Sequence, residues 1–332
     1  MSPKVSFPIK FILSLLLLVL TLVVSLIFGA ADISLKEVGL ALFSTSSSDG
    51  IGVIREIRLP REIAAIFVGA ALAVSGAMMQ GMTRNPLADP GLLGLTAGAN
   101  AALAFTLAFI PAANYFGIMI ACFIGAAAGA ALVFGIGAAK KGGFSPFRIV
   151  LAGAAISAFL TAIAEGIGLY FNISKNVSQW TAGGLIGTSW GQLQVVVPFI
   201  AVSLLVALLL SRQLTILSLS EEAAIGLGQK TAQVKAILFV VITLLAGAAV
   251  ALAGNMAFIG LMIPHVVRAI VGTDYRFIIP MSAVAGAIFM LLADLIGRII
   301  NAPFETPVAA IIAIIGLPFF LVIVRKGGKA FA

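Results

Sequence analysis

The chain has 332 residues and a net charge of +8; 61% of its residues are hydrophobic and only 10% are charged. A water-soluble domain carries about 25% charged residues, and the mean hydropathy here is +1.20, so a water-soluble fold is excluded. The Lys and Arg residues are scattered among apolar runs, which argues against a nucleic-acid partner and makes the charge a signal of membrane topology.

Apolar runs long enough to cross a bilayer recur along the whole chain. A bilayer core needs about 20 apolar residues per helix, and such runs extend from Phe11 to Val324. We therefore predict a single all-α integral membrane domain over residues 1–332, with about ten transmembrane helices in contact with lipid. The predicted spans are 9–29, 62–82, 91–110, 116–138, 149–171, 191–211, 234–254, 256–271, 277–297 and 306–324.

The first apolar run, from Phe11 to Phe28, follows Lys4 and Lys10 and has two interpretations. It resembles a signal peptide with a small-residue cleavage site near residues 29–31. However, the run is longer than the usual ~7–15-residue core of a signal peptide, and similar helices follow it. These features favour a retained first span.

The distribution of positive charge predicts the orientation in the cell membrane. With the N-terminus in the cytoplasm, 14 of the 20 Lys and Arg residues lie on the cytoplasmic side, as the positive-inside rule requires. Six lie outside: Lys36, Arg55, Arg58, Arg61, Lys175 and Arg298. An even number of spans returns the C-terminus to the cytoplasm, so we expect both termini there.

Two of the outer arginines stand at the mouth of the second span, in the segment Arg58-Leu59-Pro60-Arg61. Pro60 suits the first turn of a helix, because its missing N–H removes no hydrogen bond there. Both guanidinium groups should then surround the helix start. The pattern predicts an acidic external partner, and snorkelling to lipid headgroups is the alternative.

Arg298 is a third outer arginine, one helical turn after Asp294 in the ninth span, with Glu305 in the loop that follows. An Asp-to-Arg pair four residues apart can be purely structural. Three arginines on one face nevertheless form a plausible docking set, because a guanidinium group binds a carboxylate through two parallel hydrogen bonds.

A short helix is predicted on the cytoplasmic side, over residues 220–228. Ser220 is a suitable N-cap, Glu221 and Glu222 complement the positive end of the helix dipole, and Gly228 can supply a left-handed C-terminal cap. A helix of fewer than ten residues is marginal alone, so this one should lie against another surface.

The remaining reactive side chains do not form a catalytic or metal site. Cys122 is the only cysteine and His265 the only histidine, so neither a disulfide nor a metal centre is predicted, and no cofactor is expected. Paired carboxylates and nucleophile motifs are lacking, which makes a membrane-embedded enzyme improbable. An ion-gradient-driven transporter stays an alternative, with Glu165 and Asp294 as the coupling candidates.

Three blocks of sequence resemble the FecCD-type permease family, which imports iron-siderophores, haem and cobalamin. The first runs from Arg58-Leu59-Pro60-Arg61 through Val68-Gly69-Ala70-Ala71-Leu72-Ala73-x-Ser75-Gly76-Ala77-x-x-Gln80 to Asn85-Pro86-Leu87-Ala88-x-Pro90-x-Leu92-Leu93-Gly94; the others are Phe258-Ile259-Gly260-Leu261-x-x-Pro264-His265-x-x-Arg268 and Leu292-Ala293-Asp294-x-x-x-Arg298. Glu222-Ala223-Ala224-x-x-x-Gly228 matches the first half of the coupling-helix signature of ABC-importer permeases, whereas the expected Ile-x-Leu-Pro ending is absent.

The resemblance covers essentially the whole chain and implies a BtuC-like fold of ten helices that works as a homo- or heterodimer of permease subunits. Its implied partners are a cytoplasmic ABC ATPase dimer, an external substrate-binding protein and a metal-chelate substrate. This chain has no phosphate-binding loop of its own, so the ATPase is another polypeptide. By motif position, docking falls to Arg58, Arg61 and Arg298, ATPase coupling to Glu221, Glu222, Ala223, Ala224 and Gly228, and a cytoplasmic gate to Asn85 and Leu87.

Overall fold

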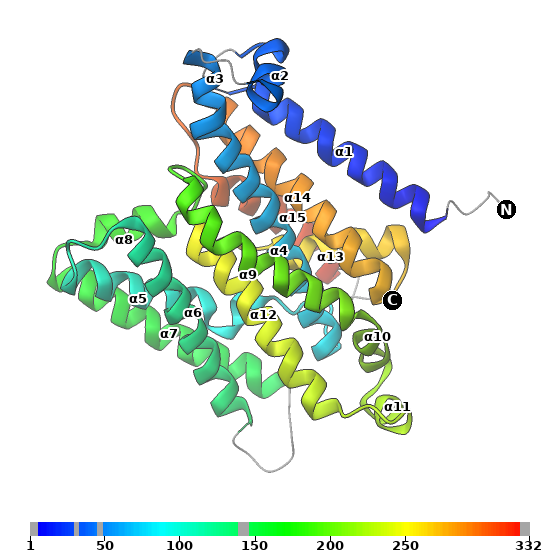
Figure 1. The fold of residues 1–332 in the computed structure, drawn as a ribbon. Helices are drawn as coiled ribbons and strands as arrows, with labels where there is room; N and C mark the ends of the chain where they lie inside the picture. Colours follow the sequence, from blue (N-terminus) through cyan, green and yellow to red (C-terminus); the bar gives the residue numbers. More distant parts are fainter. Residues whose placement is uncertain (1–5, 30–32, 45–48, 139–145, 326–332) are drawn as a thin grey trace.

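The computed structural model describes residues 6–29, 33–44, 49–138 and 146–325, and every regular element within these ranges is helical (Figure 1). In chain order the elements are α1 (Phe7–Ile27), α2 (Leu35–Phe43), α3 (Asp49–Val53), the π-helix η1 (Ile54–Arg58), α4 (Leu59–Thr83), the 3₁₀-helix η2 (Pro90–Leu93), α5 (Leu95–Phe109), α6 (Tyr115–Ala138), α7 (Pro146–Tyr170), α8 (Ser174–Thr181), α9 (Trp190–Leu209), α10 (Ser211–Leu219), α11 (Glu221–Gly226), α12 (Thr231–Ala253), α13 (Ile259–Val271), α14 (Tyr275–Ile299) and α15 (Val308–Arg325). The predicted all-α fold is confirmed for this part of the chain.

Each of the ten predicted spans overlaps one of these helices. Among the described residues, seven helical runs are long and apolar enough to cross a membrane, whereas α5, α13 and α15 are apolar but shorter. A multi-pass membrane protein is thus confirmed, but a count of ten crossings is not. The apolar runs do not predict α2, α8 or α10, because these helices are too short to span a bilayer.

The second predicted span belongs to a longer helix. Pro60 stands in the first turn of α4, as predicted, but α3 and η1 lead into α4 without a break, so the helical run begins well before this proline. The π-helix accommodates the proline. The N–H of Leu59 bonds to the carbonyl oxygen of Ile54 with π-helical spacing, and the next residue, Pro60, has no N–H to place in the ladder.

α4 is the centre of the bundle. Nearly all of its residues are buried, and it packs against α9, α12, α13 and α14, whereas most of α1 is exposed at the edge. A Cβ atom at Gly69 would overlap the backbone of Gly286 on α14, and one at Gly76 would overlap Gly260 on α13. Helices in lipid associate through such close backbone contacts, since water expulsion does not drive them together there.

Two other predicted spans are shortened by residues with positive φ. Gly94, at φ +74°, separates η2 from α5 within the predicted span 91–110. Phe258, at φ +68°, stands directly before α13, so this helix begins at Ile259 and not at residue 256. A positive φ is uncommon for a residue with a side chain, and an apolar run does not signal it.

The contacts of α1 define the two ends of the subunit. At its start, Phe7 packs against Phe277 of α14, and Lys10 donates a hydrogen bond to the last turn of α13. At its other end, α1 accepts hydrogen bonds from Arg58. We call this the arginine end. It is capped by α2 and α3 and lies opposite α10 and α11 (Figure 1). Residues 30 and 31 belong to the cleavage site of the signal-peptide interpretation, and they lie outside the described ranges.

Candidate functional site

Arg61 lies inside the arginine end and binds two carboxylates. Its Nε and Nη2 atoms lie 3.0 and 2.9 Å from Asp294 Oδ1. Its Nη1 and Nη2 atoms lie 2.8 and 2.9 Å from the two carboxylate oxygens of Glu305. Arg61 therefore joins α4 to α14 and to the loop between α14 and α15.

Arg298 is buried next to Arg61 and shares Asp294 with it. Its Nε lies 3.0 Å from Asp294 Oδ2, which confirms the predicted pair four residues apart. Its Nη2 lies 2.6 Å from Glu62 Oε1 and 2.6 Å from the hydroxyl of Ser25 on α1. Glu62 and Asp294 are fully buried. A buried charge is costly unless it is paired, and each of these carboxylates has an arginine.

Arg58 is held by the end of α1. Its Nη1 donates to the carbonyl oxygens of Leu26 and Ile27, at 2.6 and 2.9 Å. The last carbonyls of a helix have no partner within the helix and carry the negative end of its dipole. A Cβ atom at Gly29 would lie 2.9 Å from the guanidinium group of Arg58 and 3.4 Å from that of Arg298, so glycine makes room for both.

These contacts correct the expected accessibility of the arginines. Arg58, Arg61 and Arg298 are only 5–7% exposed, so they are not free groups at the surface, and headgroup snorkelling does not describe them. The accessible side chain is Glu305, at 31%. Their docking role stays a prediction. We call the set the arginine network: Arg58, Arg61, Glu62, Asp294, Arg298 and Glu305.

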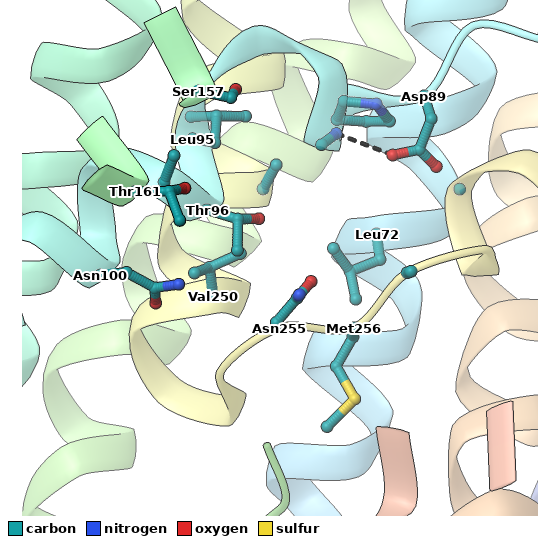
Figure 2. A pocket seen from close by; sticks show the side chains of 16 residues that line it. Leu72, Asp89, Leu95, Thr96, Asn100, Ser157, Thr161, Val250, Asn255 and Met256 are labelled. Carbon is teal, nitrogen blue, oxygen red and sulfur yellow. Dashed lines mark hydrogen bonds between the residues drawn. The ribbon is translucent and has the colours of Figure 1, made fainter. Parts of the chain in front are cut away.

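A cavity of about 480 Å³ lies between α4, η2, α5, α7 and the segment before α13 (Figure 2). Its polar side chains are mostly uncharged. They are Asp89, Thr96, Asn100, Ser157, Thr161 and Asn255. Figure 2 shows Asn100, Thr161 and Ser157 along one wall and Asn255 across from them. The cavity therefore offers hydroxyl and amide groups inside a membrane protein.

A second cavity, of about 330 Å³, continues the first one towards α8, since Asn100 and Thr161 line both. Ser157, Thr161 and Glu165 follow one another at four-residue intervals and so lie on one face of α7. Ser174, Ser178 and Thr181 of α8 complete its polar lining. We call the joined lining of both cavities the polar groove.

The polar groove is open to the outside of the subunit. Thr161 and Glu165 are exposed although α7 is a candidate membrane span, and Asn255, before α13, is exposed as well. Polar and charged side chains within a membrane span are costly when they face lipid. The open side of the groove therefore faces water or another subunit, and not lipid.

The turn after α4 leads into this groove. Arg84, at φ +52°, ends the helix, and the N–H of Asn85 bonds to the carbonyl of Gln80. Asn85 Oδ1 accepts from the N–H of half-buried Leu87 at 3.0 Å, which closes a tight turn. Asp89 follows at the mouth of η2, where burial raises the pKa of its carboxyl group. The gate role of Asn85 and Leu87 stays a prediction.

At the opposite end of the subunit, α11 lies where a short helix over 220–228 is predicted. The hydroxyl of Ser220 accepts from the N–H of Ala223 at 2.9 Å, and Gly228 adopts φ +77° just after the C-cap residue Leu227. Both predicted caps are thus confirmed. Glu221 and Glu222 occupy the first turn, and the side chains of Glu222 and Ala223 are exposed.

One face of α11 is attached to the bundle and the other is exposed. Ala224 is fully buried, and Glu221 Oε1 lies 2.6 Å from the Nζ atom of buried Lys235 on α12. Ile225 and Leu227 point away from the bundle, at 59% and 70% exposure. A six-residue helix is too short to be stable alone, so contacts such as these hold it, together with a longer ion pair between Glu221 and Arg84, and they leave an apolar surface free.

His265 and Asp294 each have a structural environment. His265 is 2% exposed, with Nδ1 2.9 Å from the carbonyl oxygen of Leu261. Among the described residues, no group of three or more His, Cys, Asp or Glu side chains could hold a metal ion. Asp294 is bound by two arginines, so of the two coupling candidates of a gradient-driven transporter only Glu165 faces a cavity.

Sequence reasoning missed several residues that hold these regions together. Glu62 and Lys235 are examples. Gln80 is another: it donates to the carbonyl of Gly260 at 3.2 Å and accepts from Arg268 on α13. A charged or amide side chain inside an apolar span is a signal that a partner exists, but the sequence does not say which residue that partner is.

Comparison with known proteins gives consistent matches over nearly the whole chain. A model of the FecCD transport family matches residues 17–326. The iron(3+)-hydroxamate import system permease protein FhuB of Bacillus subtilis is 46% identical over 321 residues, which cover 96% of this chain and 83% of that protein. The Fe(3+)-citrate import system permease protein YfmD of the same species is 39% identical over 96% of this chain and 94% of that protein.

The fold also matches a solved structure, an inward-facing conformation of a protein classed as a metal-chelate type ABC transporter. The TM-score is 0.85 at 29% sequence identity, and the match covers 96% of this chain and 99% of that chain. The family match over residues 17–326 includes the residues of both the arginine end and the α11 end.

Proposed function

The chain belongs to the FecCD transport family and is a membrane permease of that family; from this premise we propose that it is the translocating subunit of an ATP-driven importer for iron-siderophore-type chelates. A second permease subunit, identical or paralogous, completes the pathway. Two cytoplasmic ABC ATPases supply the energy, and an external binding protein delivers the chelate. The subunit itself has no catalytic role.

The exposed face of α11 carries this proposal. Glu221, Glu222, Ala223, Ala224 and Gly228 build a capped helix whose outer surface is apolar at Ile225 and Leu227. An exposed apolar patch on a short, anchored helix suits insertion into a cleft of a partner. Through this contact, closure of the ATPase pair would move α12 and the helices packed against it.

Docking of the binding protein is proposed at the arginine end, on Arg58, Arg61 and Arg298. The burial of these residues adds a condition to that proposal. Glu305 already binds Arg61 through two oxygens and is the exposed acid of the arginine network. A carboxylate of the binding protein would replace Glu305 on Arg61, because one guanidinium group offers few donors.

The pathway is proposed to follow the polar groove, with the turn at Asn85 and Leu87 as its cytoplasmic gate. The open side of the groove supports this proposal, since its exposed polar groups need water or another subunit beside them. Two subunits that face each other across α7 would enclose such a path.

We propose that the permease lies in the inner membrane of the cell. The α11 end and both termini then face the cytoplasm. The excess of Lys and Arg residues on that side supports it. The start of α1, the end of α13 and α10 also lie at the α11 end.

The experiment is uptake of radioactive iron by cells with and without this gene. Iron is presented as hydroxamate, citrate, catecholate and haem complexes, and either ATP or the proton gradient is removed. We expect gene-dependent uptake of at least one chelate, lost on ATP depletion and retained when the gradient collapses. Uptake that follows the gradient instead would support the secondary transporter with Glu165 as its coupling residue.

A further inference from the structure

The charge of the polar groove bears on which chelates can pass. The two cavities contain acidic side chains at separate positions, Asp89 near η2 and Glu165 near α8. Among the described residues, no Lys, Arg or His side chain lines either cavity. The other polar side chains of these linings carry hydroxyl or amide groups.

Glu165 is the acid most directly presented to a passing molecule. It continues the face of α7 that holds Ser157 and Thr161, and its side chain is exposed. Asp89 is partly buried, and its Oδ1 accepts from the N–H of Gly91 at 2.7 Å (Figure 2). A carboxylate near low-dielectric walls focuses its field into the cavity. The groove should thus attract cations, tolerate neutral polar molecules and repel anions.

Ferric chelates differ in net charge, so such a groove would discriminate among them. Three hydroxamate anions balance the charge of a ferric ion, so a trihydroxamate complex is neutral, or cationic when it carries a free amine. Three doubly charged catecholates leave a trianion. We propose that the polar groove selects neutral and cationic hydroxamate-type chelates and disfavours polyanionic ones, with Glu165 as the main specificity-determining residue. This inference rests on the proposed importer function.

The test uses one chelator scaffold, so that shape stays constant while charge changes. A linear ferric trihydroxamate is prepared with its terminal amine free, acetylated or succinylated, which makes the complex cationic, neutral or anionic. Uptake of each radioactive complex is measured in proteoliposomes that hold the complete permease–ATPase complex and its binding protein. Because the binding protein is the same throughout, differences between permease variants report on passage through the membrane.

The variants are Glu165→Gln and Glu165→Lys, with Glu56→Lys as a matched control because Glu56 is an exposed glutamate outside the groove. We expect Glu165→Lys to raise the ratio of anionic to cationic uptake on the order of tenfold, Glu165→Gln to raise it less, and Glu56→Lys to leave it unchanged. ATP hydrolysis stimulated by the loaded binding protein should persist. If the Glu165→Lys subunit does not insert into the membrane, the uptake ratio of Glu165→Gln tests the role of Glu165.

The outcomes separate this inference from the proposed function. Loss of ATP-dependent uptake for all chelates by the unaltered complex would overturn the importer itself. Uptake with ratios that do not respond to either Glu165 variant would overturn only the role of the groove. Uptake confined to a ferric tricatecholate would also overturn it.

Discussion

Charged residues meet at both ends of this subunit, but in opposite ways. In the arginine network, Arg61, Arg298, Glu62 and Asp294 are buried and bound to one another. At the α11 end, one close ion pair joins α11 to Lys235 and Ala224 is buried, while Glu222, Ala223, Ile225 and Gly226 are exposed. The same residue types therefore consolidate the fold at one end and leave a surface for a partner at the other.

The difference follows from the cost of removing charge from water. Removal of one partner from a buried pair leaves an uncompensated charge and costs about 3–5 kcal/mol, whereas an exposed pair contributes about 0–1 kcal/mol. A change in the arginine network should thus alter the stability of the whole subunit. A change on the free face of α11 should alter binding and leave the fold intact.

The largest effect is expected for Arg61→Ala. It leaves Asp294 fully buried with one arginine instead of two and frees Glu305, so the variant should lose about 3–5 kcal/mol of stability. Thermal unfolding in detergent, followed by the loss of monodisperse protein, measures this. The matched control is Arg276→Ala, which removes an ion pair to Asp274 at the surface. Equal melting temperatures for both variants would show that the arginine network is not a structural unit.

A similarly large effect, on binding and not on folding, is expected for the pair Ile225→Asp and Leu227→Asp. Both side chains are exposed, so the subunit should fold normally, while a buried charge in the partner cleft weakens the complex by at least about 2 kcal/mol. Co-purification of the ATPase from membranes is the readout. Ile57→Asp is the control, since Ile57 is also 59% exposed but lies at the arginine end. Full recovery of the ATPase with the α11 variant would place the coupling surface elsewhere.

Much of the fold is predictable from apolar runs, because the bilayer requires long apolar helices and each predicted span overlaps one. The misses have local causes. The π-helix η1 and α3 extend the helical run ahead of Pro60, and Gly94 and Phe258 break spans through positive φ. Such features depend on backbone geometry and not on hydrophobicity, so a hydropathy pattern cannot contain them.

The candidate site was predictable in position but not in environment. The caps of α11 follow from local chemistry at Ser220 and Gly228, which is why they were predicted correctly. The burial of Arg61 depends on Asp294 and Glu305, more than two hundred residues later in the chain. A single sequence shows that an arginine in a membrane helix needs a partner, but it does not show how the helices bring that partner close.

An intermediate effect is expected where α11 is anchored. Glu221→Gln removes the carboxylate that binds the buried ammonium group of Lys235, which should cost about 1–3 kcal/mol. Lys235→Met, which removes the charge and keeps an apolar stem, should cost less. Hydrogen exchange of the amides of α11 reports the local opening. The same protection in Glu221→Gln as in the unaltered chain would mean that the ion pair does not anchor the helix.

The smallest effect is expected at Asp274, which caps α14 just before the helix begins and also accepts from Thr215 of α10. Hydrogen bonds from the Arg276 side chain lower the pKa of this carboxyl group. Its contribution to stability is therefore present above the pKa of the unfolded chain, about 3.9, and is lost as the pH falls through the lower folded value. The site is at the surface, so the contribution at neutral pH should be below about 1 kcal/mol.

Asp274→Asn tests the direction of this pH dependence of stability, because asparagine can still cap the helix. We expect the variant to melt slightly below the unaltered chain at pH 7 and the gap to close as the pH falls below about 4. Melting curves at a series of pH values measure it. A gap that widens in acid would mean that the carboxyl group is held in its protonated form, and the contact between α10 and α14 would then depend on the neutral acid.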